Sequence, residues 1–188
     1  MALHTTGDNA GIYAVDSITG AYTLLELLNQ QTLLGTPEKF AYHRATGKAA
    51  IEYNKNFNTA TPNQEILAWT AIPGDEVFNT ALADAQDSSP TFTPDGRLMF
   101  SRYDMVQSQG STLLVTIGQG AGPVTLENEM VNYGPDSFSA DGQTLYFAMG
   151  NGTGTVSIYQ RPLSGGQASV VVDGATLSCR PGFPTLLR

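Results

Sequence analysis

The sequence predicts an all-β protein, a β-propeller of about four blades that is closed by pairing of its N- and C-terminal strands. Pro90–Asp104 (PTFTPDGRLMFSRYD) and Asp136–Asn151 (DSFSADGQTLYFAMGN) are near-copies, and their residues Phe92 and Phe138 lie 46 positions apart. A repeat of this length in a strand-rich chain is typical of propeller blades. It indicates the architecture much more strongly than it indicates an activity.

A second repeated element supports the first. Ile12–Gly20 (IYAVDSITG) and Ile66–Gly74 (ILAWTAIPG) align without gaps, and looser copies occupy Thr112–Gly120 and Ser157–Gly165. Each copy alternates apolar and polar residues, reaches a glycine-containing turn and continues into another β-rich run, which is the signature of a β-hairpin. The apolar residues that the alignment places in register are Tyr13, Leu67, Leu113 and Ile158.

The near-copies contain a hairpin of another kind. In Pro94–Gly96 and Ala140–Gly142, aspartate can accept backbone hydrogen bonds across a turn while glycine supplies a positive φ. Tyr42–Tyr53 is a degenerate third copy with its turn at Thr46-Gly47, and Pro181–Phe183 begins a fourth. We therefore assign four residues to the structure of these turns, namely Asp95, Gly96, Asp141 and Gly142.

The order of these elements predicts one domain over residues 1–188. The run Tyr22–Leu33 is predicted as strand rather than helix, because of its place in the repeat. The chain begins and ends at different points of the repeat, and this favours a closed monomer in which the C-terminal strand joins the first blade. The alternative is an open arc whose exposed edges pair two copies into a ring of about eight blades. The predicted blades are 36–86, 88–132 and 134–178, with a composite blade from 9–31 plus 180–188.

The pattern P-x-F-[ST]-x-D-G-x-x-[LM]-x-F resembles the repeat of TolB-type propellers, also called WD40-like or PD40 repeats. One copy matches at Pro90, Phe92, Asp95 and Gly96, with Phe100 one residue before the last phenylalanine of the pattern, and the other matches at Phe138, Asp141, Gly142, Leu145 and Phe147. The resemblance implies a disc-like binding scaffold. Propellers of this family usually have six or seven blades, and this chain lacks the additional α/β domain of the Tol-system protein, so no Tol role follows.

Composition excludes several kinds of partner. There are 9 Lys and Arg against 17 Asp and Glu, which gives a net charge of −8 with no basic cluster, so nucleic acid is not an expected partner. No apolar run is long enough for membrane insertion. Cys179 is the only cysteine, so we expect no internal disulfide. The first ten residues lack signal-peptide features, which leaves a cytoplasmic protein or a mature or trimmed periplasmic or secreted form.

We expect no enzymatic activity, no cofactor and no metal. The G-x-S-x-G nucleophile motif is absent, and the only histidines are His4, in a terminus expected to be frayed, and His43, expected to be structural. The predicted function is a non-catalytic scaffold that binds a protein or peptide. The alternative is an accessory domain of a hydrolase or lyase, or a carbohydrate-binding module.

Few residues are singled out for binding. Tyr53, Tyr103 and Tyr133 lie near predicted strand ends and are expected to be exposed, whereas Trp69 is expected to pack between blades. The candidate binding residues are Tyr53, Tyr103 and Asp104. The carbohydrate or enzyme alternative further predicts that one mouth of the central channel gathers Asp84, Asp104, Glu127, Tyr53 and Tyr103.

Overall fold

The computed structural model describes residues 2–4, 11–27, 35–55, 63–70, 76–80, 84–131, 137–150 and 155–176. Within these ranges the chain forms β-strands and one short 3-10 helix, η1 (Gly174–Thr176). The strands make four antiparallel sheets of three or four strands, and each sheet is built from strands that are consecutive in the chain. The prediction of an all-β protein is confirmed for the described residues.

The first sheet has the order β1-β2-β3 and consists of β1 (Ala2–His4), β2 (Gly11–Val15) and β3 (Tyr22–Leu27). The expectation of a frayed terminus around His4 is wrong, because Ala2–His4 pairs antiparallel with β2. Strand rather than helix is confirmed for Tyr22–Leu27. The predicted contribution of residues 180–188 to this sheet lies outside the described residues.

The second and third sheets are complete four-stranded units. The second runs β4 (Gly35–His43), β5 (Lys48–Lys55), β6 (Asn63–Trp69) and β7 (Glu76–Asn79), beside the predicted repeat 36–86. The third runs β8 (Ala85–Phe92), β9 (Leu98–Asp104), β10 (Gln109–Val115) and β11 (Val124–Glu127), beside the predicted repeat 88–132.

The fourth sheet consists of β12 (Thr144–Gly150), β13 (Val156–Pro162) and β14 (Ser169–Val172), beside the predicted repeat 134–178. An isolated bridge joins Phe138 to Leu145. Phe138 thus takes the place beside β12 that β8 takes beside β9, because Phe92 pairs in the same way with Leu98.

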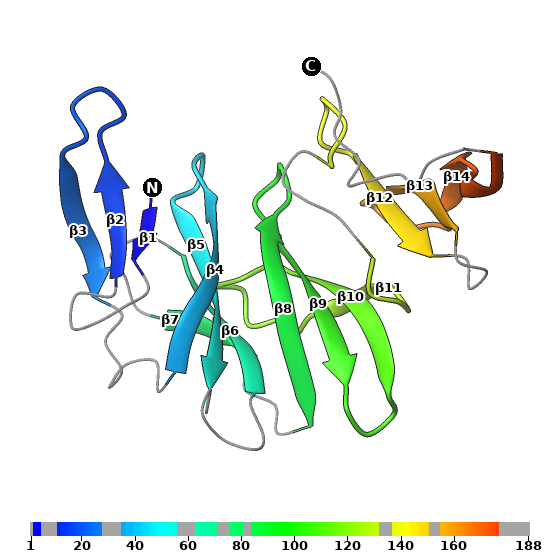
Figure 1. Ribbon diagram of the computed structural model, residues 1–188, viewed down its shortest axis with the longest axis horizontal. Coiled ribbons are helices and arrows are strands. Elements are labelled where there is room, and N and C mark those ends of the chain that lie inside the picture. The colour runs from blue at the N-terminus through cyan, green and yellow to red at the C-terminus, as the bar shows by residue number, and fades with distance from the viewer. Residues whose placement is uncertain are drawn as a thin grey trace.

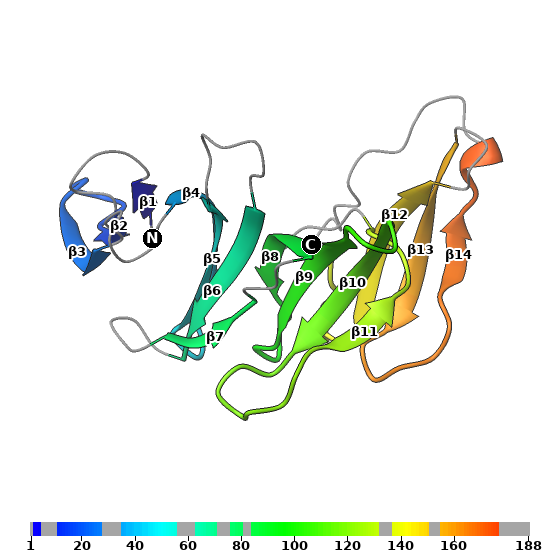
Figure 2. The same cartoon turned by 90° about the horizontal axis from the view of Figure 1, so that it is seen from below.

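The four sheets follow one another in chain order, from the blue first sheet to the yellow and orange fourth sheet (Figures 1 and 2). The first and fourth sheets lie at opposite ends of this series. Apolar side chains fill the space between each pair of neighbours, which is the inter-sheet packing expected for aromatic and aliphatic repeat residues. The main contributors are Ile12, Ile51, Leu67 and Trp69 between the first and second sheets; Ile66, Ala68, Phe92 and Phe100 between the second and third; and Met99, Leu114, Leu145 and Phe147 between the third and fourth.

Each sheet presents its two faces to different neighbours, since side chains alternate along a strand. In β6, Ile66 and Ala68 pack toward the third sheet, whereas Leu67 and Trp69 pack toward the first. In β10, Leu113 packs toward the second sheet. We call the face toward the following sheet the leading face and the face toward the preceding sheet the trailing face.

The turn that follows Phe138 is one residue longer than its counterpart. It spans residues 139–144 between Phe138 and Leu145, whereas residues 93–97 separate Phe92 from Leu98. Leu145 is therefore equivalent to Leu98, and both side chains lie on trailing faces.

The structure also corrects the predicted register of the last hairpin. The alignment equated Ile158 with Leu113, but the structure places Tyr159 on the trailing face, with its ring stacked on Phe147 at a centroid distance of 5.7 Å. Ile158 consequently lies on the leading face. A shift of one residue is enough to exchange the faces of a strand.

Two of the predicted turns pack directly on their neighbours. Gly96 has φ +82°, and a Cβ added there would lie 3.1 Å from Nδ1 of His43. Gly142 has φ +70°, and an added Cβ would lie 2.7 Å from Cβ of Pro94. Glycine at these positions therefore serves both the turn conformation and the contact between adjacent sheets. The ring nitrogens of His43 lie 2.8 Å from Oγ1 of Thr46 and 3.2 Å from the Pro94 carbonyl oxygen.

Asp95, in the first of these turns, makes the free energy of unfolding depend on pH in the acid range. Partial burial acts to raise the pKa of Asp95, but hydrogen bonds from Arg97 and Thr93 outweigh it and hold the pKa below its ordinary value. The Arg97 Nε–Asp95 Oδ2 distance is 2.9 Å. A lowered folded-state pKa contributes stability above the unfolded-state pKa of about 3.9, and this contribution is lost as pH falls through the folded-state value.

We therefore expect Asp95→Asn to be less stable than the unsubstituted chain at pH 7, by less than about 1 kcal/mol because the pair is partly exposed. The difference should narrow below about pH 4. Urea unfolding between pH 7 and pH 3 measures it, with the exposed Asp84→Asn as control. A difference that stays constant over this range would contradict the linkage.

Candidate functional site

The β9–β10 hairpin carries an exposed and well-ordered tip. Oδ1 of Asp104 accepts hydrogen bonds from the backbone N–H groups of Val106 (2.9 Å) and Gln107 (2.8 Å). Ser108 completes the turn with a positive φ of 54°. These local bonds fix the turn, as aspartate side chains commonly do. Within this hydrogen-bonded turn, the Met105 side chain is 40% exposed and the Val106 side chain is 75% exposed.

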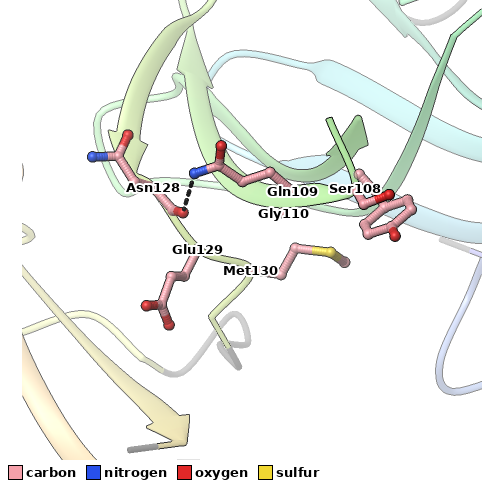
Figure 3. A pocket seen from close by; sticks show the side chains of 7 residues that line it. Ser108, Gln109, Gly110, Asn128, Glu129 and Met130 are labelled. Carbon is pink, nitrogen blue, oxygen red and sulfur yellow. Dashed lines mark hydrogen bonds between the residues drawn. The ribbon is translucent and has the colours of Figure 1, made fainter. Parts of the chain in front are cut away.

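A hollow of about 450 Å³ adjoins this hairpin. The side chains and backbone that line it are Tyr103, Ser108, Gln109, Gly110, Asn128, Glu129 and Met130 (Figure 3). Gln109 donates a long hydrogen bond of 3.4 Å to the Asn128 carbonyl oxygen, and Figure 3 shows this contact joining the two strands' ends.

The segment after β11 is anchored beside the hollow by a buried threonine. Thr112 is fully buried, donates its hydroxyl to the Glu129 carbonyl oxygen at 2.9 Å and accepts the Val131 N–H at 3.3 Å. Met130 packs over Gly110, where an added Cβ would lie 2.6 Å from Cγ of Met130. The glycine thus lets the methionine lie close to β10.

We use the name hairpin surface for the hollow together with its exposed apolar residues, Tyr103, Met105, Val106 and Met130, which are 39–75% exposed. Its charge is acidic: Glu129 lines the hollow, and Asp84 lies beside the hairpin, where its carbonyl oxygen accepts the Met105 N–H at 2.9 Å. No lysine or arginine is among the described lining residues. Methionine and aromatic side chains at an exposed site are suited to contacts with apolar partner residues.

A second polar cluster lies between the second and third sheets. Glu52 is fully buried, and its Oε2 accepts the Ser89 backbone N–H at 2.6 Å and lies 3.3 Å from Nζ of Lys39. Lys39 Nζ also donates to Oγ of Ser89 at 3.2 Å. Ser89 occupies an irregular register of β8 and has a positive φ of 57°, a conformation that costs energy in a non-glycine residue.

This arrangement of serine, lysine and glutamate places a hydroxyl beside an amine, as some hydrolytic sites do. Its electrostatics favour a structural role. Buried Glu52 needs a cation close by, and Nζ of Lys39 supplies it in an ion pair of 3.3 Å. The strained backbone of Ser89 directs its N–H at the carboxylate, so the cluster joins the second sheet to the third.

The sequence-predicted residues do not form one site. Tyr103 lines the hollow, and Asp104 caps the turn beside it. The expected exposure of Tyr53 is wrong: it is 3% exposed and donates its hydroxyl to Glu65 in the packing between the first and second sheets. Trp69 is buried in the same packing, as predicted.

The remaining candidates lie elsewhere. Glu127 accepts a hydrogen bond from Nη1 of Arg161 at 2.6 Å, which joins the third sheet to the fourth. Tyr133 lies outside the described residues. Of the five residues predicted to share one mouth, only Tyr103 lines the hollow. The sequence did not single out Met105, Val106 or Met130; their signal was apolar residues in otherwise polar turns.

Among the described residues, no group of three or more histidine, cysteine, aspartate and glutamate side chains is placed to hold a metal ion. Within the same ranges, no helix has the length and apolar character needed to cross a membrane.

The comparisons with known proteins bear on the fold. No family model and no curated protein sequence matches the chain. Among solved structures, TolB from Acinetobacter baumannii superposes with a TM-score of 0.54 at 14% identity, over 89% of this chain and 39% of that chain. A luciferin-regenerating enzyme gives a TM-score of 0.36 at 14% identity, over 68% of this chain and 60% of that chain. The chain thus spans about 39% of the TolB chain that it resembles, and the likeness shows a TolB-like fold.

Proposed function

We propose that this chain is a non-catalytic, propeller-type scaffold that binds a protein or peptide partner at the hairpin surface. Each sheet would correspond to one blade, about four in all, and the turns at Asp95 and Asp141 would belong to the WD40-like type of repeat. The observation that carries the proposal is the exposed Val106 and Met105 on a hairpin that Asp104 holds in place. A pre-ordered apolar site loses little conformational entropy on binding.

The charge of this surface indicates the chemistry of the partner. Glu129 and Asp84 are exposed near the hairpin, whereas the neighbouring Arg102 is engaged with buried Asp87. Complementary charge raises the rate at which two partners associate and fixes how they align. We therefore propose a peptide segment in which an apolar residue is flanked by lysine or arginine. The net charge of −8 supports a partner other than nucleic acid.

The carbohydrate-binding and hydrolase-accessory alternatives have less support. They rest on acidic and aromatic residues that converge around one mouth, and Tyr53 lies in the inter-sheet packing while Glu127 pairs with Arg161. Among the residues that the structure describes, the Lys39–Ser89 pair is the nearest approach to a catalytic group, and its lysine is engaged with Glu52.

Selection of displayed random peptides on the purified chain, followed by fluorescence polarisation with the enriched sequences, tests the proposal. We expect enriched peptides to combine a large apolar residue with lysine or arginine and to bind more weakly as salt rises. Val106→Asp should raise their Kd at least about tenfold, because it places a carboxylate where an apolar contact is made.

The matched control is Ile18→Asp, which changes a 93% exposed residue in the β2–β3 turn and should leave binding unchanged. Loss of affinity in both variants, or in neither, would place the binding site elsewhere. Failure to enrich any peptide, together with turnover of a substrate by the purified chain, would overturn the scaffold proposal itself.

A further inference from the structure

The outer face of the first sheet is apolar and exposed. Cross-strand pairing places Tyr13 opposite Leu24 and Val15 opposite Tyr22, so these four side chains share one face. The rings of Tyr13 and Tyr22 meet edge to face at 5.7 Å. Tyr22 is 74% exposed, Leu24 46% and Val15 42%. Ile12, on the opposite face, is fully buried against the second sheet.

The repeat shows what normally covers this face. Tyr13 and Val15 align with Leu67 and Trp69, which are 2% and 4% exposed because the first sheet packs on them. Leu113 in the third sheet is covered by the second sheet in the same way. The trailing face of a sheet in this molecule is thus built to receive the leading face of another sheet, and the first sheet has none before it in the described chain.

A leading face is available at the other end of the molecule. In the fourth sheet Tyr146 pairs with Gln160 and Ala148 with Ile158, on the face opposite the packing around Phe147. On this face Ala148 is 2% exposed, whereas the side chains of Tyr146, Ile158 and Gln160 are partly exposed. Figures 1 and 2 place this sheet at the far end from the first sheet, so the two faces of one copy do not meet.

We propose that the outer face of the first sheet binds the leading face of the fourth sheet of a second copy of this chain. A strand added at a sheet edge lies about 4.8 Å from its neighbour and leaves the face uncovered, whereas a packed sheet lies about 10 Å above it. The closed monomer predicted from the sequence requires both faces in one copy to meet. A second copy can cover the first sheet instead, through the same kind of face-to-face contact that joins the three pairs of neighbouring sheets.

The area of this contact indicates how strongly two copies of the chain should associate. Three strands spaced about 4.8 Å apart with about 3.4 Å per residue give a footprint on the order of 250 Å², well below the roughly 800 Å² per partner of a standard interface. Two such contacts form if two copies close a ring, and successive contacts give an open assembly if they do not. We expect association that rises with protein concentration.

Light scattering over a concentration series is the first measurement. The unsubstituted chain should shift from 20.0 kDa toward about twice that mass or more as concentration rises. Val15→Asp combined with Tyr22→Asp should remain monomeric, while Ile18→Asp should associate normally. Circular dichroism checks that each variant is folded; these side chains are exposed, so folding should persist. A chain that stays monomeric at every concentration overturns the proposal.

Cross-linking identifies the faces. With Cys179→Ser as background, a tagged Val15→Cys chain and an untagged Gln160→Cys chain are mixed and treated with a short bismaleimide. We expect a tagged-plus-untagged product, and none when Ile18→Cys replaces Val15→Cys. Preferential linking of Val15→Cys chains to each other would overturn the proposal in favour of a symmetric contact. Concentration-independent linking within a single Val15→Cys/Gln160→Cys chain would overturn it in favour of the closed monomer.

Discussion

Phe100→Ala is expected to lower the free energy of unfolding by about 3–5 kcal/mol, the range for removing a buried phenylalanine side chain. Phe100 is fully buried between the second and third sheets, where it packs with Ala50, Ile66 and Ala68. Its loss leaves a cavity at the contact that holds two sheets together. Since small domains are stable by only about 5–15 kcal/mol, this one change should remove a large fraction of the total.

Urea unfolding followed by circular dichroism measures the effect, with Tyr103→Ala on the same strand as control. Tyr103 is 39% exposed, so its truncation should cost under about 1 kcal/mol. If both variants lost the same small amount, the contact between the second and third sheets would not be a major source of stability. An increased slope with denaturant would instead indicate a change in the surface exposed on unfolding.

Arg102→Met is expected to destabilise the chain by about 3–5 kcal/mol, because it leaves a buried carboxylate without its cation. The Asp87 side chain is only 1% exposed, and both of its oxygens accept hydrogen bonds of 2.8 Å from Arg102. The guanidinium also lies 5.6 Å from the centroid of the Phe100 ring. Such a pair is costly to break on one side only.

The double variant Asp87→Leu/Arg102→Met is the matched control. Replacing both partners of a buried ion pair with apolar residues is often close to neutral, so stability should return most of the way to that of the unsubstituted chain. A double variant as unstable as Arg102→Met alone would show that the pair acts through packing rather than charge. The comparison requires unfolding curves for the two single variants and the double variant under one set of conditions.

The sequence predicted the hairpins because their causes are local. Asp95-Gly96 and Asp141-Gly142 carry the turn chemistry themselves, and alternation around Ile12 and Ile66 marks strands with two different faces. The strand over Tyr22–Leu27 was recovered despite its leucines because its place in the repeat outweighed helix propensity. These features depend on residues a few positions apart.

What the sequence could not predict depends on residues far apart in the chain. The burial of Tyr53 follows from its pairing with Glu65 and from the first sheet packing over it, and neither leaves a mark near position 53. Glu52 in isolation suggests an exposed strand residue, and only the fold brings Lys39 and Ser89 to it. The hairpin surface was missed because its mark in the sequence is only a few apolar residues in otherwise polar turns.

The single additional residue between Phe138 and Leu145 has a consequence for how a repeat is found in a sequence. Strand pairing, not residue count, fixes which side chains face the neighbouring sheet, so the loop absorbs the added residue and the faces are kept. Equivalent residues of the third and fourth sheets therefore lie at different spacings along the chain while they occupy the same positions in space. A search of the sequence for one fixed spacing would miss some of these equivalent residues.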